Sequence, residues 1–287
     1  MYTNAEVMMK IRYLGTAAAE GFPAVFCNCA ACKAARKDIG RELRTRSQML
    51  VNEDLLIDFP PESYYHAMRF GVDLSAVRTL LVTHSHTDHF YAQEFVNRGY
   101  KFAEGMASES LDIYGNSEVL SVYEESTRRE MRDAVREHIH LHCIRPFDSV
   151  WAGGYEIFVL PAHHTPKEEA LLYAIRKGKK ALLYLNDTGA VSDESMRFLE
   201  KNNFCADFVS MDCTFADDIG PHSDRHMGFA ENEKLRDRFL ENRLISPNAK
   251  YYVTHFSHNS TPLRERIDAE ASRRGFTAAY DGLEIEI

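Results

Sequence analysis

The sequence of 287 residues lacks several features that would assign it to familiar classes of protein. No apolar run approaches the roughly 18 residues needed to span a membrane, and the first residues lack the basic and apolar regions of a signal peptide. Positive charge is in deficit: 34 Lys and Arg face 43 Asp and Glu, and the net charge of −9 disfavours non-specific binding to duplex nucleic acid. There is no Gly-x-Ser-x-Gly motif and no glycine-rich phosphate loop, so nothing indicates a serine nucleophile or that type of phosphate site.

The composition that is present favours a packed globular protein. Hydrophobic residues make up 45% of the chain, with 17 Phe and 14 Tyr, which excludes intrinsic disorder. No linker or shift in composition marks a boundary, so we expect residues 1–287 to form a single domain. Of the six cysteines, three fall between residues 27 and 32, which favours metal binding over disulfides. We therefore expect a soluble, acidic, cytoplasmic protein with no membrane partner.

Short apolar stretches and amphipathic stretches follow one another along the chain. The apolar stretches predict strands over residues 10–14, 48–51, 55–59, 77–83, 111–114, 156–160, 170–176, 181–187, 207–212, 251–254 and 283–287. Residues 52–54 suit a hairpin turn between two of these strands. Amphipathic patterns predict helices over residues 117–137, 192–202 and 231–242, with Ser192 and Asp193 as candidate caps. Strands interleaved with helices in this way predict an α/β sandwich.

The strongest functional signal is the stretch Thr-His-Ser-His-Thr-Asp-His at residues 83–89, directly after an apolar stretch. Imidazole nitrogens and carboxylates are the ligands that zinc, manganese and iron prefer. A loop that leaves a strand can turn these four side chains toward one point, which a helix could not do at this spacing. The stretch therefore predicts a metal site.

This His-x-His-x-Asp-His motif after a strand resembles the signature of the metallo-β-lactamase superfamily. The resemblance implies an αββα sandwich with a one- or two-metal site along one edge of its sheets. It also implies further ligands downstream, each just past a strand. The sequence offers His163-His164, Asp187 and His255 in that order, each directly after or at the end of an apolar stretch.

The resemblance also distributes the ligands between two metal ions. One ion would be held by His84, His86 and His164, the other by Asp88, His89 and His255, and Asp187 would bridge them. We prefer His164 to His163 as the ligand, although the spacing leaves both open. Asp58 matches an aspartate that usually supports the metal loop, and a surface turn remains the alternative for it.

Two divalent ions, whether Zn, Mn or Fe, would share a hydroxide that serves as the nucleophile. Asp88 then counts among the catalytic residues as well as the ligands. A leaving alkoxide needs a proton, so a further imidazole is expected nearby. Residues 219–227 contain two candidates, and we favour His226 over His222 as the proton donor because its surroundings resemble those in related phosphodiesterases.

A second cluster, Cys27, Cys29 and Cys32, has the short spacing of a zinc knuckle and needs a fourth ligand from elsewhere. His258 lies three residues beyond His255, and the intervening turn can direct it toward these cysteines. We expect a structural Cys₃His zinc that ties the two parts of the chain together, separate from the catalytic metals.

Both ends of the chain resemble one branch of the superfamily, the phosphoribosyl cyclic phosphodiesterases of phosphonate breakdown. The shared features are Gly-Thr at residues 15–16, Gly-x-Pro at 21–23, the cysteine cluster, Thr-His-x-Ser-His at 254–258 and Asp-Gly-x-Glu-Ile at 281–285. The resemblance does not cover an insertion at roughly residues 91–150. There His138, His140 and His142 alternate along the chain, where they could face solvent, line the substrate side or form a third metal site.

These features predict a metal-dependent phosphodiesterase that acts on a small or cyclic phosphodiester. Hydrolysis of another ester, such as a lactone or thioester, stays open because the fold does not fix the substrate. A non-hydrolytic role in biosynthesis of a quinone cofactor also stays open, since a protein of that kind has a similar N-terminus. The acidic charge and the cysteine cluster speak against tRNA 3′-processing nucleases. The expected partner is a small phosphoester, and a homodimer is allowed by the resemblance.

Overall fold

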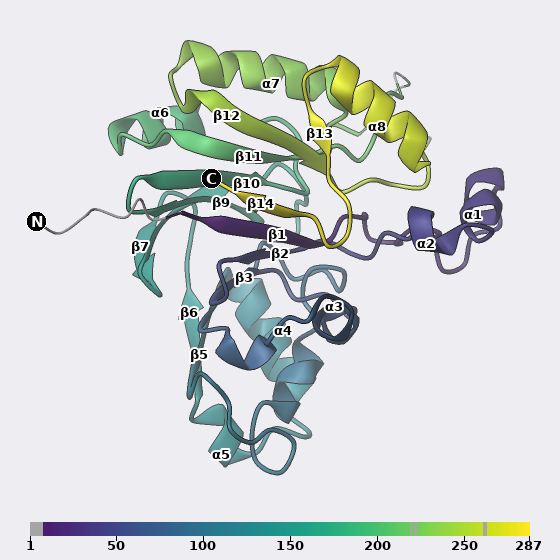
Figure 1. Ribbon diagram of the computed structural model, residues 1–287. Coiled ribbons are helices and arrows are strands. Elements are labelled where there is room, and N and C mark those ends of the chain that lie inside the picture. Colours follow the sequence, from purple (N-terminus) through teal and green to yellow (C-terminus); the bar gives the residue numbers. More distant parts are fainter. Residues whose placement is uncertain (1–7, 219, 221–222, 261–262) are drawn as a thin grey trace, which may run out of the picture.

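The computed structural model describes residues 8–218, 220, 223–260 and 263–287. Two seven-stranded sheets pack face to face, and helices cover the outer face of each sheet (Figure 1). This arrangement confirms the predicted αββα sandwich. Within the described residues, none of the helices has the length and apolar character required to cross a membrane.

The first sheet has the strand order β14-β1-β2-β3-β4-β5-β6. Its strands are β1 (Lys10–Gly15), β2 (Gln48–Val51), β3 (Leu55–Ile57), β4 (Thr79–Leu81), β5 (Leu111–Gly115), β6 (Ile139–Cys143) and β14 (Glu284–Glu286). The neighbours from β14 to β3 are antiparallel, and those from β3 to β6 are parallel. The first and last strands of the chain are therefore partners in one sheet.

The second sheet has the order β13-β12-β11-β10-β9-β8-β7. Its strands are β7 (Ser149–Ala152), β8 (Tyr155–Pro161), β9 (Leu171–Lys177), β10 (Lys180–Leu185), β11 (Ala206–Asp212), β12 (Ile245–Thr254) and β13 (Thr277–Ala278). Strands β7 to β10 form an antiparallel meander, whereas β10 to β13 are parallel. Because β10, β11 and β12 run in the same direction, their carboxyl ends lie at one edge of the sheet.

The helices fall into two groups. Helices α6 (Asp193–Lys201), α7 (Phe229–Glu241) and α8 (Arg264–Arg273) lie on the side of the second sheet in Figure 1. Helices α3 (Ser63–Phe70), α4 (Ser117–Thr127) and α5 (Asp133–Arg136), with the 3₁₀ turns η1 (Leu74–Ala76) and η2 (Ala92–Asn97), lie on the side of the first. The short helices α1 (Ala30–Ala35) and α2 (Ile39–Glu42) project to one side of the sandwich.

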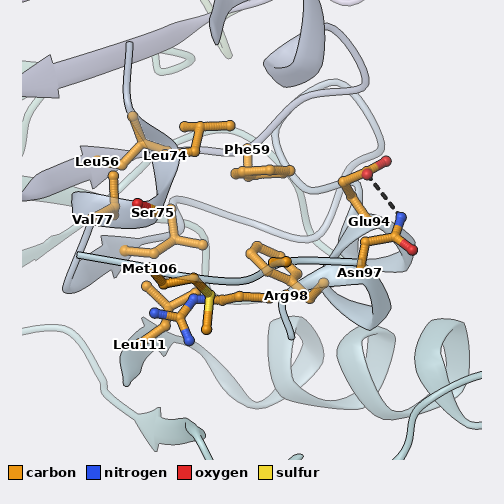
Figure 2. A pocket seen from close by; sticks show the side chains of 13 residues that line it. Leu56, Phe59, Leu74, Ser75, Val77, Glu94, Asn97, Arg98, Met106 and Leu111 are labelled. Carbon is orange, nitrogen blue, oxygen red and sulfur yellow. Dashed lines mark hydrogen bonds between the residues drawn. The ribbon is translucent and has the colours of Figure 1, made fainter. Parts of the chain in front are cut away.

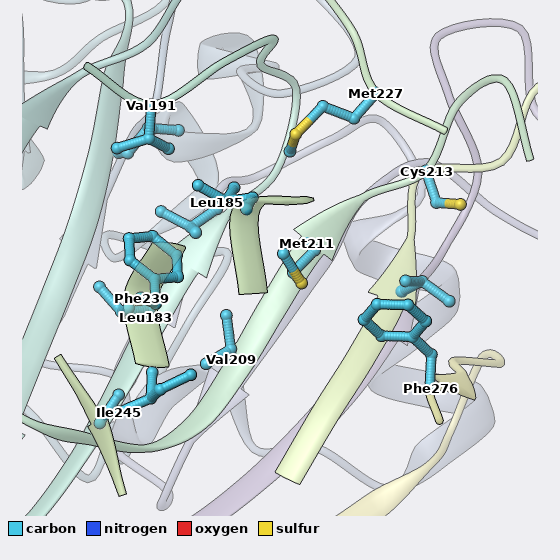
Figure 3. Close-up of a cluster of buried hydrophobic side chains, with 14 of the residues drawn as sticks. Leu183, Leu185, Val191, Val209, Met211, Cys213, Met227, Phe239, Ile245 and Phe276 are labelled. Carbon is cyan, nitrogen blue, oxygen red and sulfur yellow. The ribbon is translucent and has the colours of Figure 1, made fainter. Parts of the chain in front are cut away.

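The buried apolar side chains form three main clusters that match these layers. One fills the space between the sheets, where the Tyr13 hydroxyl donates to Ser210 of the opposite sheet at 2.8 Å. Another lies between the second sheet and α6–α8, and Figure 3 shows Leu183, Val209 and Phe239 within it. A third lies between the first sheet and α4. Each fully buried side chain of this size contributes about 1.5–3 kcal/mol.

Most predicted elements are present, with three differences. The helix predicted over residues 117–137 is wrong: α4 ends at Thr127, and a separate short helix, α5, covers Asp133–Arg136. Three of the predicted strands also end two residues early, β3 at Ile57, β4 at Leu81 and β10 at Leu185, and the residues that follow them enter the site described below. Strands β7 and β13 and the helices α1, α2, α3 and α8 were not predicted. Ser192 caps α6 as expected, accepting from Ser195 N–H at 3.1 Å.

Candidate metal centre

The residues of the predicted metal site lie where strands from both sheets end. The loop of residues 83–89 follows β4, while His164, Asp187 and His255 follow β8, β10 and β12. Asp187 and His255 adopt left-handed backbone conformations, with φ of 55° and 64°. This region is sparsely populated by residues other than glycine, and such conformations concentrate at functional sites.

One group of four ligand atoms comes from His84, His86, His164 and Asp187, all within 4.8 Å of one another. His86 Nδ1 lies 3.0 Å from His84 Nε2 and 3.2 Å from His164 Nε2. Asp187 approaches the same group, with Oδ1 3.0 Å from His164 Nδ1. The structure thus brings together the three histidines that the resemblance assigned to one metal ion.

A second group comes from Asp88, His89, Asp187 and His255, again within 4.8 Å. His89 Nε2 lies 3.2 Å from Asp88 and 3.1 Å from Asp187. Asp187 belongs to both groups, which is the bridging position expected for it. Burial would raise the pKa of Asp187, but the imidazoles of His255, His89 and His84 outweigh burial and hold that pKa well below its usual range.

Several buried atoms in these two groups lie close to one another but form no hydrogen bond of acceptable geometry. They are His89 Nε2, His164 Nδ1, Asp187 Oδ1 and His255 Nε2. Burying a polar atom without a partner is costly, and imidazole nitrogens with carboxylate oxygens are ligands for divalent transition metals. The donor set therefore fits one or two such ions.

Two buried carboxylates hold the imidazoles in place. Asp58 is fully buried, so the surface-turn alternative for it is wrong: it accepts from His89 Nδ1 at 2.7 Å and from Thr83 N–H at 2.8 Å. Asp212, at the end of β11, lies 3.3 Å from His255 Nδ1. A carboxylate on the far ring nitrogen orients the ring and leaves Nε2 for a metal ion.

Asp212 was not predicted as a site residue from the sequence. It stands at the end of an apolar strand, as the predicted ligands do, and that position could have identified it. Burial alone would raise the pKa of Asp212. The neighbouring His226 and His255 outweigh burial and lower that pKa to about 2. Its second oxygen accepts the backbone N–H of Met227 at 2.9 Å, which fixes the chain next to His226.

His226 lies at the edge of the cluster. Its Nδ1 is 3.2 Å from both Asp187 and Asp212. Burial lowers its pKa, but the charge of Asp212 and a hydrogen bond to it, together with Asp187, raise it to about 9. The imidazole is thus protonated near neutrality. His222, the alternative, lies outside the described residues.

The structure places His164, and not His163, in the ligand cluster. His163 points out of the cluster and pairs with Asp224 at 3.1 Å, while His164 faces Asp187. Gly189 lets this segment pass close to the neighbouring loop, because a Cβ there would lie 1.8 Å from the Asp224 carbonyl oxygen.

A cleft of about 720 Å³ opens onto the cluster. Its described lining includes His86, His164 and His226 of the cluster, together with Lys167 and Arg225. Among these described lining residues there are two cations and no carboxylate, in a chain whose net charge is −9. The cleft therefore favours an anionic ligand.

The predicted Cys₃His set also comes together. Ligand atoms of Cys27, Cys29, Cys32 and His258 lie within 4.8 Å of one another, and His258 Nδ1 is 3.7 Å from Cys29 Sγ and 3.8 Å from Cys32 Sγ. Ligand atoms around a tetrahedral zinc are about 3.6 Å apart for bonds of 2.0–2.3 Å. Glu20 accepts the His258 backbone N–H at 3.0 Å and supports this turn.

The cysteine cluster contains one thiol with a lowered pKa and one with a raised pKa. The backbone N–H of Cys32 and the His258 ring lower the pKa of Cys29 to about 6, while burial raises that of Cys32 to about 11. The thiolate is the form that binds zinc, so Cys29 is prepared for it at neutral pH.

Two other features lie outside both clusters. On β6, His140 and His142 lie 3.4 and 2.7 Å from Asp112, but among the described residues this trio is not a group with ligand atoms within 4.8 Å. An apolar cavity of about 190 Å³ lies among Phe59, Leu74 and Met106 (Figure 2). Its described lining contains no histidine or cysteine, so it does not extend the metal site.

The chain is similar to several known proteins over most of its length. A family model described as "Beta-lactamase superfamily domain" matches residues 56–246. Coenzyme PQQ synthesis protein B of Acinetobacter baumannii (strain ACICU) is 24% identical over 322 aligned positions, covering 97% of this chain and 100% of that protein. The protein of the same name from Methylobacillus flagellatus (strain ATCC 51484 / DSM 6875 / VKM B-1610 / KT) is 23% identical, covering 96% and 99%.

Two solved structures superpose over nearly the whole chain. A diphosphatase from the PhnP family has a TM-score of 0.73 at 22% identity, with 98% of this chain and 97% of that chain covered. Zinc-bound PqqB from Methylobacterium extorquens has a TM-score of 0.73 at 18% identity, with 97% and 100% covered. At these identities the likeness shows a shared fold.

Proposed function

The chain belongs to the β-lactamase superfamily and has its metallo-β-lactamase sandwich, and from this premise we propose that it is a binuclear metal-dependent hydrolase of a small or cyclic phosphodiester. One observation carries the proposal. Buried nitrogen and oxygen atoms that form no hydrogen bond of acceptable geometry converge beside a cleft whose described lining holds Lys167 and Arg225 and no carboxylate. Such a cleft suits a substrate that is itself negatively charged.

The two ligand groups described above would hold the two ions, with Asp187 between them. When bound, divalent cations supply Lewis acidity: they polarise a phosphoryl oxygen and make water a better nucleophile at neutral pH. The chain's own contribution is to fix the ligands beforehand. Asp58 and Asp212 hold the His89 and His255 rings from behind, so that little reorganisation is needed.

The residues of the cleft would bind the substrate and protonate the leaving group. Lys167 and Arg225 have no ion pair within 4 Å among the described residues, so their charges are available to an anion. His226, held by Asp212 and protonated near neutrality, is the proton donor for a leaving alkoxide.

We assign the Cys₃His cluster to a structural zinc. Its sulfur-rich donor set suits zinc, and the closed set of four ligands leaves no position for a substrate. The catalytic centre, by contrast, carries imidazole and carboxylate ligands that accept Zn, Mn or Fe.

Two other functions compete with this proposal. A lactone or thioester is uncharged at the reacting group and would make no use of the two cations in the cleft. The relatives named coenzyme PQQ synthesis protein B match the chain over 97% of its length, which favours a biosynthetic role as the second candidate. The structural neighbour from the PhnP family is a diphosphatase, and a diphosphate substrate would be anionic like the phosphodiester proposed here.

A substrate panel tests the proposal. Metal-stripped protein is reloaded with Mn²⁺ or Zn²⁺ and assayed on bis(p-nitrophenyl) phosphate, cyclic nucleotides, phosphoribosyl cyclic phosphate, a lactone and a thioester. We expect metal-dependent cleavage of phosphodiesters, a raised KM for them in Lys167→Ala and Arg225→Ala, and no effect of Asp112→Ala. Cleavage of the lactone or thioester alone, or tight binding of coenzyme PQQ without phosphodiester cleavage, would overturn the proposal in favour of the corresponding alternative.

A further inference from the structure

Glu168 belongs to neither metal group, yet it connects three parts of the chain that meet at the metal centre. It lies in the loop between β8 and β9, four positions after His164. Its Oε1 accepts the Ser85 hydroxyl at 2.7 Å, and its Oε2 accepts the Ser85 backbone N–H at 3.0 Å. The same Oε2 accepts from Asn116 Nδ2 at 2.8 Å.

The two partners of Glu168, Ser85 and Asn116, lie next to the metal ligands or in a segment that supports them. Ser85 stands between His84 and His86, so fixing its backbone fixes the spacing of those two imidazoles. Asn116 caps α4, accepting the Val119 backbone N–H at 2.9 Å, and it also donates to the Glu169 carbonyl at 2.9 Å. The middle segment of the chain, for which the sequence offered no role, thus supplies the anchor for the loop that carries His164.

The chemistry of this position calls for a carboxylate. Oε1 also lies 3.2 Å from the Ser85 backbone nitrogen, so each oxygen accepts from two donors, and of these only the Ser85 hydroxyl could also act as an acceptor. A glutamine would turn its NH₂ group toward the Ser85 backbone N–H in either orientation of the amide. The start of α4 adds a favourable field for negative charge.

The two halves of the centre are supported differently. Asp58 contacts the His89 ring directly, and the Thr83 hydroxyl that it holds lies 3.0 Å from His84 Nδ1, so Asp58 reaches both halves. Glu168 touches no metal-binding atom in the described structure and instead holds the backbone between His84 and His86 to the loop of His164. The contacts of Glu168 therefore lie in the His84, His86 and His164 half alone.

We propose that Glu168 is a positioning residue for the His84, His86 and His164 half of the metal centre: it sets the spacing of these three imidazoles in advance and thereby strengthens binding of the ion in that half. This inference rests on the proposed binuclear centre. A carboxylate that orients a ligand in this way typically changes metal affinity by about 10–100-fold when it is removed.

The test measures binding of Mn²⁺ to the full-length chain after mild chelation, by equilibrium dialysis, without recourse to activity. Mn²⁺ is chosen because imidazole and carboxylate ligands accept it and thiolates do not favour it. Two backgrounds isolate the halves: Asp88→Ala leaves the His84 half intact, and His86→Ala leaves the other half. Glu168→Gln is then added to each background.

We expect Glu168→Gln to weaken Mn²⁺ binding about 10–100-fold in the Asp88→Ala background and by less than about threefold in the His86→Ala background. Glu169→Gln is the matched control, because Glu169 is the exposed neighbouring carboxylate, and it should change neither affinity. Ser85→Ala removes the hydroxyl that donates to Glu168 and should weaken Mn²⁺ binding by the same half of the centre. Adding Glu168→Gln to Ser85→Ala should cost less than it does alone, because both act on one contact.

Equal losses on both backgrounds, or no loss in the Asp88→Ala background, would overturn the inference. If Glu168→Gln does not fold, Ser85→Ala decides by the same comparison of backgrounds. A wild-type chain that binds fewer than two Mn²⁺ and cleaves no phosphodiester would overturn the proposed function and this inference with it. A wild-type chain that binds two Mn²⁺ but is insensitive to Glu168→Gln would overturn the inference alone.

Discussion

The proposed catalytic cluster and the cysteine cluster are built in opposite ways. The proposed catalytic cluster draws four residues from the loop after β4 and one each from the ends of β8, β10 and β12, and most of them are buried. The cysteine cluster takes three ligands from residues 27–32, where Cys32 belongs to the projecting helix α1 (Figure 1), and a fourth from His258. The two clusters share one turn, because His255 and His258 are three positions apart.

This difference indicates a division of labour. Imidazole and carboxylate ligands at the base of an open cleft accept exchangeable ions and leave room for a substrate. Four ligands that include three thiolates would close around one zinc ion and so join distant parts of the chain. A substitution in the proposed catalytic cluster should therefore leave the chelation-resistant zinc in place. A substitution in the cysteine cluster should leave the activity in place.

The largest effect is expected from Asp187→Ala and His86→Ala. Each removes a ligand of the catalytic pair, so phosphodiesterase activity should fall at least about 10³-fold. Circular dichroism should show a folded chain, and metal analysis after mild chelation should still find one zinc per chain. Near-normal turnover in either variant would break the comparison, because the cluster would then not be the catalytic one.

His226→Ala tests the edge of the catalytic cluster. Loss of a proton donor should slow hydrolysis of a substrate with a poor leaving group by about 10²–10⁴-fold. The loss should be much smaller on a p-nitrophenyl ester, whose phenolate leaves without a proton. Comparison of kcat on the two substrates measures the difference, and equal losses would assign His226 another role and make His222 the next candidate.

Cys29→Ser and His258→Ala address the other cluster. Each should lose the chelation-resistant zinc and lower the unfolding temperature by about 10 °C, since zinc binding at about 1,000 times its Kd contributes about 4 kcal/mol. Activity measured well below the unfolding temperature should remain. Cys205→Ser is the matched control, because Cys205 is an exposed cysteine outside the cluster. Equal destabilisation by Cys205→Ser would contradict the proposal that a zinc ion joins these two parts of the chain.

The smallest effect concerns the reactivity of the metal-free thiols. Because the pKa of Cys29 is lowered to about 6, the thiolate predominates at pH 7 and is lost as the pH falls below 6. Alkylation by iodoacetamide, followed by peptide mass spectrometry, should therefore reach half its maximal rate near pH 6. Burial and Asp207 raise the pKa of Cys205, so Cys205 should react at least about tenfold more slowly at pH 7. Zinc should protect Cys29, and a midpoint above pH 8 would contradict the assignment.

The sequence predicted the parts of the site whose residues are close together in the chain. It also predicted those that follow one rule, a single polar residue directly after an apolar strand. The metal loop is contiguous, the cysteines are close in sequence, and His164, Asp187 and His255 each follow an apolar strand. Asp212 obeys the same rule at the end of β11, yet it was overlooked because no metal-loop motif surrounds it.

Other features could not be predicted because they depend on long-range contacts. Glu168 reads as one of two acidic residues in a loop, and only its contact with Ser85, 83 positions away, distinguishes it from Glu169. The end of α4 at Thr127 is also invisible in the pattern, because Met131 and Val135 still pack on the cluster that α4 covers although the helix has ended.

The partnership of β1 with β14 has a consequence for the synthesis of the protein. Arg12 pairs with Glu284, 272 positions later, and Cys29 meets His258 229 positions later. At ribosomal rates, about 15–55 s pass between synthesis of the two strands, and for that time one edge of β1 has no partner. A nascent chain in this state exposes an unpaired strand and free thiols to neighbouring chains. Chaperones that cover the unpaired strand, and zinc supplied during synthesis, should therefore raise the yield of folded protein.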